Sequence, residues 1–96
     1  MAKLYISPSN PFYPPIELPV YTLDDGQFYR TVYHPQGWSD RPDYTLAADG
    51  KIYRTSYHPD GTDDSPDYLI QTDLALARSA THPDGKPGVV DFQLVD

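Results

Sequence analysis

The chain has 96 residues and a net charge of −7, and 22% of its residues are charged while 39% are hydrophobic. This length fits one small domain, near the size at which a single hydrophobic core only just suffices. The acidic balance disfavours nucleic acids and anionic membranes, which are bound through basic patches, and the lack of cysteine excludes a disulfide-stabilised scaffold.

The N-terminal segment, MAKLYISPSN, lacks the apolar stretch of roughly seven or more residues that a signal peptide needs. No stretch of the sequence approaches the run of about 18 apolar residues that is typical of a membrane span. We therefore expect a cytoplasmic protein without a membrane partner.

The first predicted element is a strand within residues 1–11. Lys3–Ser7 has residue types in nearly the same order as Lys51–Thr55, and Pro11 falls where Pro59 does. The chain thus begins in the second half of a repeated unit whose complete form is residues 44–67.

Residues 7–20 form a proline-rich connector, with five prolines that favour an extended path. This connector departs from the repeat. It is suited to covering a barrel end or a neighbouring subunit, or to presenting Phe12 and Tyr13 to a partner.

Three complete repeats follow, in residues 21–43, 44–67 and 68–91. Each repeat has an arginine, then a loop that begins with His-Pro and ends with glycine. The arginines are Arg30, Arg54 and Arg78, and the loops, here called the His-Pro loops, are His34–Gly37, His58–Gly61 and His82–Gly85.

Each repeat predicts a β-hairpin. In residues 44–67, a first strand at Tyr44–Ala47 is followed by Asp49-Gly50, a strong hairpin-turn signal. The second strand is expected from Lys51 to about His58, with alternating faces. In the third repeat, Asp73–Ala80 has helical propensity, but its place in the repeat predicts a strand.

Residues 91–96 are predicted to be a closing strand, because Phe92–Leu94 matches Tyr44–Leu46. The two chain ends together complete a fourth unit. We predict an all-β fold, in which an antiparallel meander of about eight strands closes into a small barrel. A pinwheel of four hairpins is an alternative, and pairing of the terminal strands between chains would give a domain-swapped or symmetric dimer.

The repeated charges predict ion pairs between units. Each repeat ends in an aspartate, so Arg30, Arg54 and Arg78 are expected to pair with Asp43, Asp67 and Asp91. A ring of arginines around an anion site is the functional alternative, but Ile6 takes the fourth position and would break such a ring.

The histidines and one acidic loop are weak metal candidates: His34, His58, His82, Asp60, Asp63 and Asp64. Equivalent residues of a meander lie two strands apart, roughly 10 Å at the usual strand spacing. They would converge on one ion only if the loops folded toward a common axis. We therefore interpret the histidines as strand-closing residues, the aspartates as turn residues, and predict no metal.

Aromatic residues outside the repeat pattern are the leading binding candidates. Trp38 lies in a loop where the other repeats have Thr62 and Lys86. The predicted binding residues are Trp38, Tyr13, Phe12, Tyr33 and Tyr57. Tyrosine rings beside carboxylates also suit carbohydrates, through stacking and hydrogen bonds.

No motif in the sequence identifies a reaction. There is no cysteine, no G-x-S-x-G nucleophile elbow and no glycine-rich phosphate loop. The leading hypothesis is a non-enzymatic binding or protein-interaction module without a cofactor. It would act as a homo-oligomer such as a dimer, and bind another protein or a carbohydrate. The alternatives are a small carbohydrate-active or metal-dependent enzyme that uses the His-Pro loops, and a self-assembling structural protein.

Overall fold

The chain is built of β-strands in a computed structural model, which describes residues 2–62 and 64–96. These residues form eight strands and no helix, so none of them could cross a lipid bilayer as a long apolar helix. The strands are β1 (Ala2–Ile6), β2 (Tyr21–Asp24), β3 (Gln27–Arg30), β4 (Pro42–Leu46), β5 (Lys51–Arg54), β6 (Tyr68–Ile70), β7 (Ala75–Arg78) and β8 (Val90–Val95).

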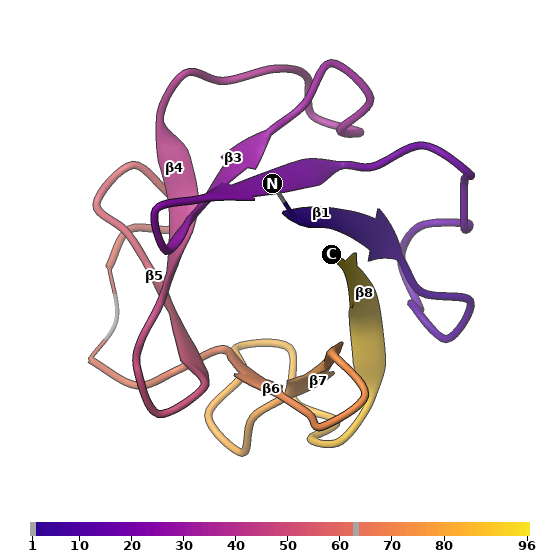
Figure 1. Cartoon of the computed structure of the whole chain (residues 1–96). Coiled ribbons are helices and arrows are strands. Elements are labelled where there is room, and N and C mark those ends of the chain that lie inside the picture. Colours follow the sequence, from indigo (N-terminus) through magenta and orange to yellow (C-terminus); the bar gives the residue numbers. More distant parts are fainter. Residues whose placement is uncertain (1, 63) are drawn as a thin grey trace.

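The strands form one closed antiparallel meander. Each strand pairs with the next along the chain, and β8 pairs with β1 to close the barrel (Figure 1). The closing register runs from Lys3 opposite Val95 to Ile6 opposite Phe92. The predicted all-β barrel is therefore confirmed. The described strands close within one chain, which leaves no free sheet edge.

Side chains from alternating strands fill the barrel. The odd-numbered strands contribute one set, whose members are at most 2% exposed: Leu4, Phe28, Ile52 and Leu76. The even-numbered strands contribute a second set toward the His-Pro loops: Tyr21, Tyr44, Tyr68 and Phe92. The even-numbered strands also contribute a third set, two residues after the second along each strand: Leu23, Leu46, Ile70 and Leu94. The open centre of the ribbon in Figure 1 is thus occupied by packed side chains.

The second strand of the central hairpin is shorter than the sequence predicts. β5 ends at Arg54 and does not continue to about His58. Thr55 begins a turn instead, because its carbonyl accepts the His58 N–H at 3.2 Å and its Oγ1 accepts the Tyr57 N–H at 3.2 Å. A hydroxyl that accepts a backbone N–H two residues later favours a turn over an extended strand.

The segment Asp73–Ala80 contains a strand, as its position in the repeat predicts. β7 covers Ala75–Arg78, and all of its residues are buried. Leu74 precedes it with a φ of 65°, at the place where Gly50 has a φ of 84° in the preceding hairpin. Strand pairing and burial therefore override the helical propensity of this segment.

Deletion of Phe92–Asp96 is expected to cause unfolding or aggregation, because it removes most of β8 and exposes an edge of β1. Thermal unfolding and light scattering measure the effect. Deletion of Asp96 alone is the control, since this residue lies beyond the end of β8. A protein that lacks Phe92–Asp96 but keeps the parent's melting temperature and solution mass would contradict the role of closure.

Candidate functional site

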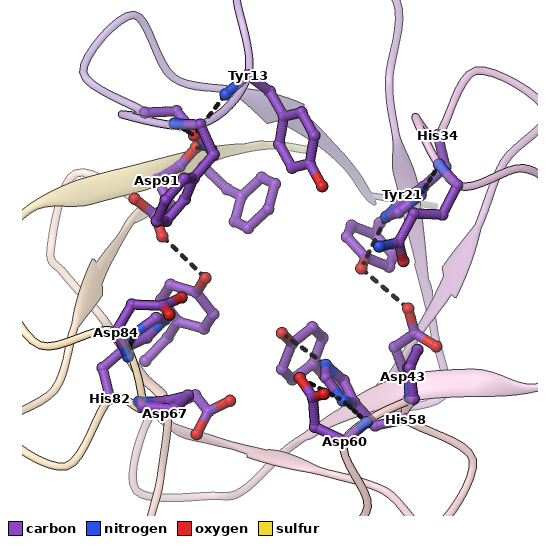
Figure 2. Close-up of a pocket in the computed structure, with 18 of the residues that line it drawn as sticks. Tyr13, Tyr21, His34, Asp43, His58, Asp60, Asp67, His82, Asp84 and Asp91 are labelled. Atoms are coloured by element: carbon purple, nitrogen blue, oxygen red, sulfur yellow. Dashed lines mark hydrogen bonds and ion pairs between the residues drawn. The ribbon is translucent and has the colours of Figure 1, made fainter.

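A cavity of about 220 Å³ opens at the barrel end that carries the His-Pro loops (Figure 2). Four of its lining side chains form a closed ring, here called the aromatic tetrad: Tyr21, Tyr44, Tyr68 and Phe92. Neighbouring rings in the tetrad pack edge to face, with centroids 5.8–6.0 Å apart. Because each ring is held by two others, the tetrad gives the cavity a rigid apolar base.

Each tyrosine of the tetrad packs against one histidine from a His-Pro loop. The ring centroids are 4.9–5.1 Å apart in the pairs His34–Tyr21, His58–Tyr44 and His82–Tyr68. All three histidines line the same cavity, so the loops do fold toward a common axis. The strand spacing alone does not predict this shared axis, but each histidine packs against a ring before its proline turn, as the sequence interpretation expects.

Hydrogen bonds fix the tautomer of the histidines. The Nδ1 atom of His34 accepts the backbone N–H of Gln36 at 3.0 Å, so the ring proton of the neutral side chain is on Nε2. That Nε2 lies 3.0 Å from the Tyr21 hydroxyl oxygen and donates to it, and the Tyr21 hydroxyl donates to Asp43 Oδ2 at 3.0 Å. The backbone bond to Nδ1 recurs in the other two loops at 3.1 Å, from Asp60 to His58 and from Asp84 to His82.

Three buried aspartates beside the cavity each hold an arginine. Their exposed fractions are 2–3%, so each carboxylate requires a charged partner. The N–O distances are 2.7 Å for Arg30–Asp43, 3.2 Å for Arg54–Asp67 and 2.9 Å for Arg78–Asp91. The ion pairs predicted from the sequence are therefore confirmed.

The fourth side of the barrel replaces this polar network with apolar contacts. Ile6 and Val20 take the arginine and aspartate positions, and they are 5% and 0% exposed. Phe92 takes the tyrosine position, and Asn10 takes the histidine position. Both members of the ion pair are thus exchanged together, which avoids leaving a buried charge without a partner.

The proline-rich connector reaches the cavity through Asn10. The Asn10 side-chain amide donates to the Asp91 carbonyl at 3.1 Å, and its Oδ1 accepts the N–H groups of Phe12 and Tyr13 at 2.9 and 3.1 Å. Phe12 and Tyr13 both line the cavity, and the Tyr13 ring extends toward its centre in Figure 2. The connector therefore lies across part of this barrel end, as one of its predicted roles requires.

The remaining predicted binding residues lie away from the cavity. Trp38, Tyr33 and Tyr57 have exposed fractions of 64%, 47% and 52%, and none of them is among the lining residues. The guanidinium of Arg41 lies 5.0 Å from the Tyr57 ring centroid. The five aromatic candidates therefore separate into two at the cavity and three on the outer surface.

The described residues contain no group of three or more histidine, cysteine, aspartate or glutamate side chains placed to hold a metal ion. Two of the weak metal candidates have neighbouring side chains, with His58 Nδ1 at 3.8 Å from Asp60 Oδ2. Asp64 is exposed and does not line the cavity. Asp63 lies outside the described residues.

Burial keeps the histidines neutral. Desolvation, together with the nearby Arg30, lowers the pKa of His34 from 6.5 to about 4. Desolvation also lowers the pKa values of His58 and His82. The same effect raises the pKa values of Tyr21, Tyr44 and Tyr68, which therefore keep their protons. At neutral pH the cavity carries charge only on its aspartates and arginine.

The sequence analysis did not identify the aromatic tetrad or the rim residues Gln36 and Asp84 as parts of a site. A signal was present, since an aromatic residue directly follows each repeated aspartate. This pattern predicts a ring of aromatic side chains only if the barrel is known to close, because closure brings the four equivalent positions around one axis.

Comparisons with family models, curated proteins and solved structures give no match for this chain.

Replacing His34 by asparagine, the residue that occupies the equivalent position at Asn10, is expected to weaken the pH dependence of stability. The pKa of His34 is lower in the folded state, so the unfolded chain binds the proton more readily. Its stabilising contribution is complete above about pH 6.5 and is lost as the pH falls toward 4. Melting temperatures across this range measure the effect, with Tyr33→Asn as an exposed control. Identical slopes for His34→Asn and the parent protein would contradict this linkage.

Replacing Arg78 by isoleucine is expected to destabilise the protein by about 3–5 kcal/mol, because Asp91 then keeps a buried charge without its arginine. The triple change Arg78→Ile, Asp91→Val and Tyr68→Phe copies the fourth side of the barrel, and should recover most of this loss. Chemical denaturation of the parent, single and triple variants measures both effects. A triple variant no more stable than Arg78→Ile would refute the equivalence of the two arrangements.

Proposed function

We propose that the protein is a non-enzymatic, cytoplasmic binding module that holds a small ligand, or one side chain of a larger partner, in the cavity of the aromatic tetrad. The observation that carries this proposal is a cavity whose polar wall is already fixed by hydrogen bonds before any ligand enters. Preorganised polar groups around an apolar base are typical of ligand sites. Binding to such a wall does not require its side chains to be ordered at the moment of association.

The size of the cavity favours a small guest. Its volume of about 220 Å³ is below the roughly 300–1,000 Å³ of pockets that enclose drug-sized ligands. One head group or side chain fits this volume better than an oligosaccharide does. The rest of a larger partner would then lie on the rim, where Phe12 is 61% exposed.

The bonding of the wall disfavours an enzyme. Each of the three buried carboxylates is paired with arginine, and Nδ1 of each histidine already accepts a backbone N–H. A general base needs a free lone pair within reach of the substrate, and the Nδ1 atoms of the histidines offer none. A fixed network is better suited to recognition than to proton transfer.

The outer surface supports self-association as a separate part of the proposal. Trp38 is 64% exposed and Val32 is 69% exposed, and large exposed apolar side chains of this kind are common in contacts between subunits. We therefore retain a homo-oligomer such as a dimer as the expected assembly.

Ligand-observed NMR with small amines, monosaccharides and monocarboxylates tests the binding function. At least one class is expected to receive magnetisation from the parent protein but not from Gln36→Trp, in which a large side chain occludes the rim. Trp38→Ala is the control, because this residue lies outside the cavity. Signals that are absent for every class, or unchanged in Gln36→Trp, would refute the proposal.

A further inference from the structure

We infer that the ligand of this cavity is an organic cation with N–H donors, a guanidinium or primary ammonium group such as that of an arginine or lysine side chain in a partner. This inference rests on the proposed binding function and specifies its ligand class. Four properties of the site support it: charge, hydrogen-bond balance, aromatic surface and size.

The mouth of the cavity is negative. Five aspartates line it, and three of them are compensated by arginines: Asp43, Asp67 and Asp91. The other two, Asp60 and Asp84, lie on the rim and have no arginine partner among the described ion pairs. Arg30 is the only cationic side chain among the described lining residues, and it is bound to Asp43. An anionic ligand would therefore meet five carboxylates and one cationic side chain, which is already bound to a carboxylate.

Several donors of the wall are already used by acceptors of the protein itself. The Nε2 protons of His34 and His58 are directed to tyrosine hydroxyls, and the hydroxyl protons of Tyr21 and Tyr68 are donated to aspartates. Ionised carboxylates only accept hydrogen bonds, and each can accept several. A sugar needs donors as well as acceptors from its site, whereas a guanidinium or ammonium group only donates.

The charge of Asp91 is not fully compensated by its partners. Its side chain is only 4% exposed, and it lines the cavity. Oδ2 accepts from Tyr68 and Arg78, but Oδ1 is buried without a hydrogen-bond partner among the described residues. Arg78 Nη2 also lacks a partner in this part of the chain, but Arg78 does not line the cavity. A buried carboxylate oxygen without a donor leaves the negative charge of Asp91 incompletely compensated beside the cavity.

Aromatic rings form much of the remaining surface. The tetrad lies at the base, while Tyr13 and Phe12 lie at the mouth. Organic cations bind favourably against such rings, by about 0.5–2 kcal/mol depending on desolvation. Phe12 already accepts a guanidinium in this way, since the Arg78 carbon Cζ is 5.2 Å from its ring centroid. A compact cation can thus contact rings and carboxylates at the same time.

The test compares N-acetyl-arginine amide with N-acetyl-citrulline amide, which has nearly the same shape but no charge. Titration calorimetry with the full chain at low salt is expected to detect the arginine compound and a much weaker citrulline interaction. Raising the salt concentration should weaken binding, because the rim charges are exposed. The double change Asp60→Asn and Asp84→Asn should weaken binding of the arginine compound roughly tenfold.

The matched control is the double change Asp40→Asn and Asp64→Asn, which removes the same charge from exposed positions outside the cavity. It should leave the affinity for the arginine compound within about twofold of the parent, because distant exposed charges are screened. Equal effects of the rim and control changes would place binding elsewhere and overturn the inference.

The remaining outcomes separate this inference from the proposed function. Equal binding of the citrulline compound, with loss of binding in Gln36→Trp, would overturn the cation while leaving a binding cavity. Binding of monosaccharides or monocarboxylates, but of neither titrated compound, would do the same. If neither compound binds and NMR shows no cavity-dependent signal for any class, both proposals are wrong.

Discussion

The buried aspartate carboxylate is the group on which this end of the barrel depends. A carboxylate that is only 2–3% exposed is stable in its charged form only with a cation and hydrogen-bond donors around it. In two of the units an arginine Nε and a tyrosine hydroxyl are both bound to one Oδ2 atom. That shared atom orients the tyrosine ring, the ring orients the histidine, and the histidine Nδ1 fixes the following loop. The walls of the cavity are therefore held in place by the same hydrogen bonds and ion pairs that stabilise the buried aspartates.

The fourth side shows that the barrel does not require this solution everywhere. Ile6, Val20 and Phe92 fill equivalent positions without charge, and they leave Asn10 free to anchor the connector. The connector then brings Tyr13 to the mouth from one side only. Three sides of the cavity are thus polar and one is apolar. The barrel has approximate fourfold symmetry, but its cavity does not. A ligand could therefore bind there in one preferred orientation.

The strands and their pairing could be predicted from the sequence. The arrangement of the three histidines around one cavity could not. Hairpin turns such as Asp49-Gly50 are local signals, and repeated Arg30–Asp43 spacings reveal neighbours along a meander. The length of β5 was overestimated because the hydroxyl of Thr55 competes with strand pairing. The meeting of His34, His58 and His82 depends on barrel closure and on the path of each loop after its strand. Both are long-range properties, which spacing along the chain does not determine.

Neutral histidines link the stability of the barrel to the charge of its cavity. Protonation of His34 at Nδ1 would break its bond to the Gln36 N–H and place a cation beside Arg30. The same desolvation that prevents this event keeps positive charge off the histidines. The aspartates of the rim, Asp60 and Asp84, are then left without a competing cation from the protein. In the cation site proposed above, no histidinium ion of the protein would have to be displaced before a cation from outside binds.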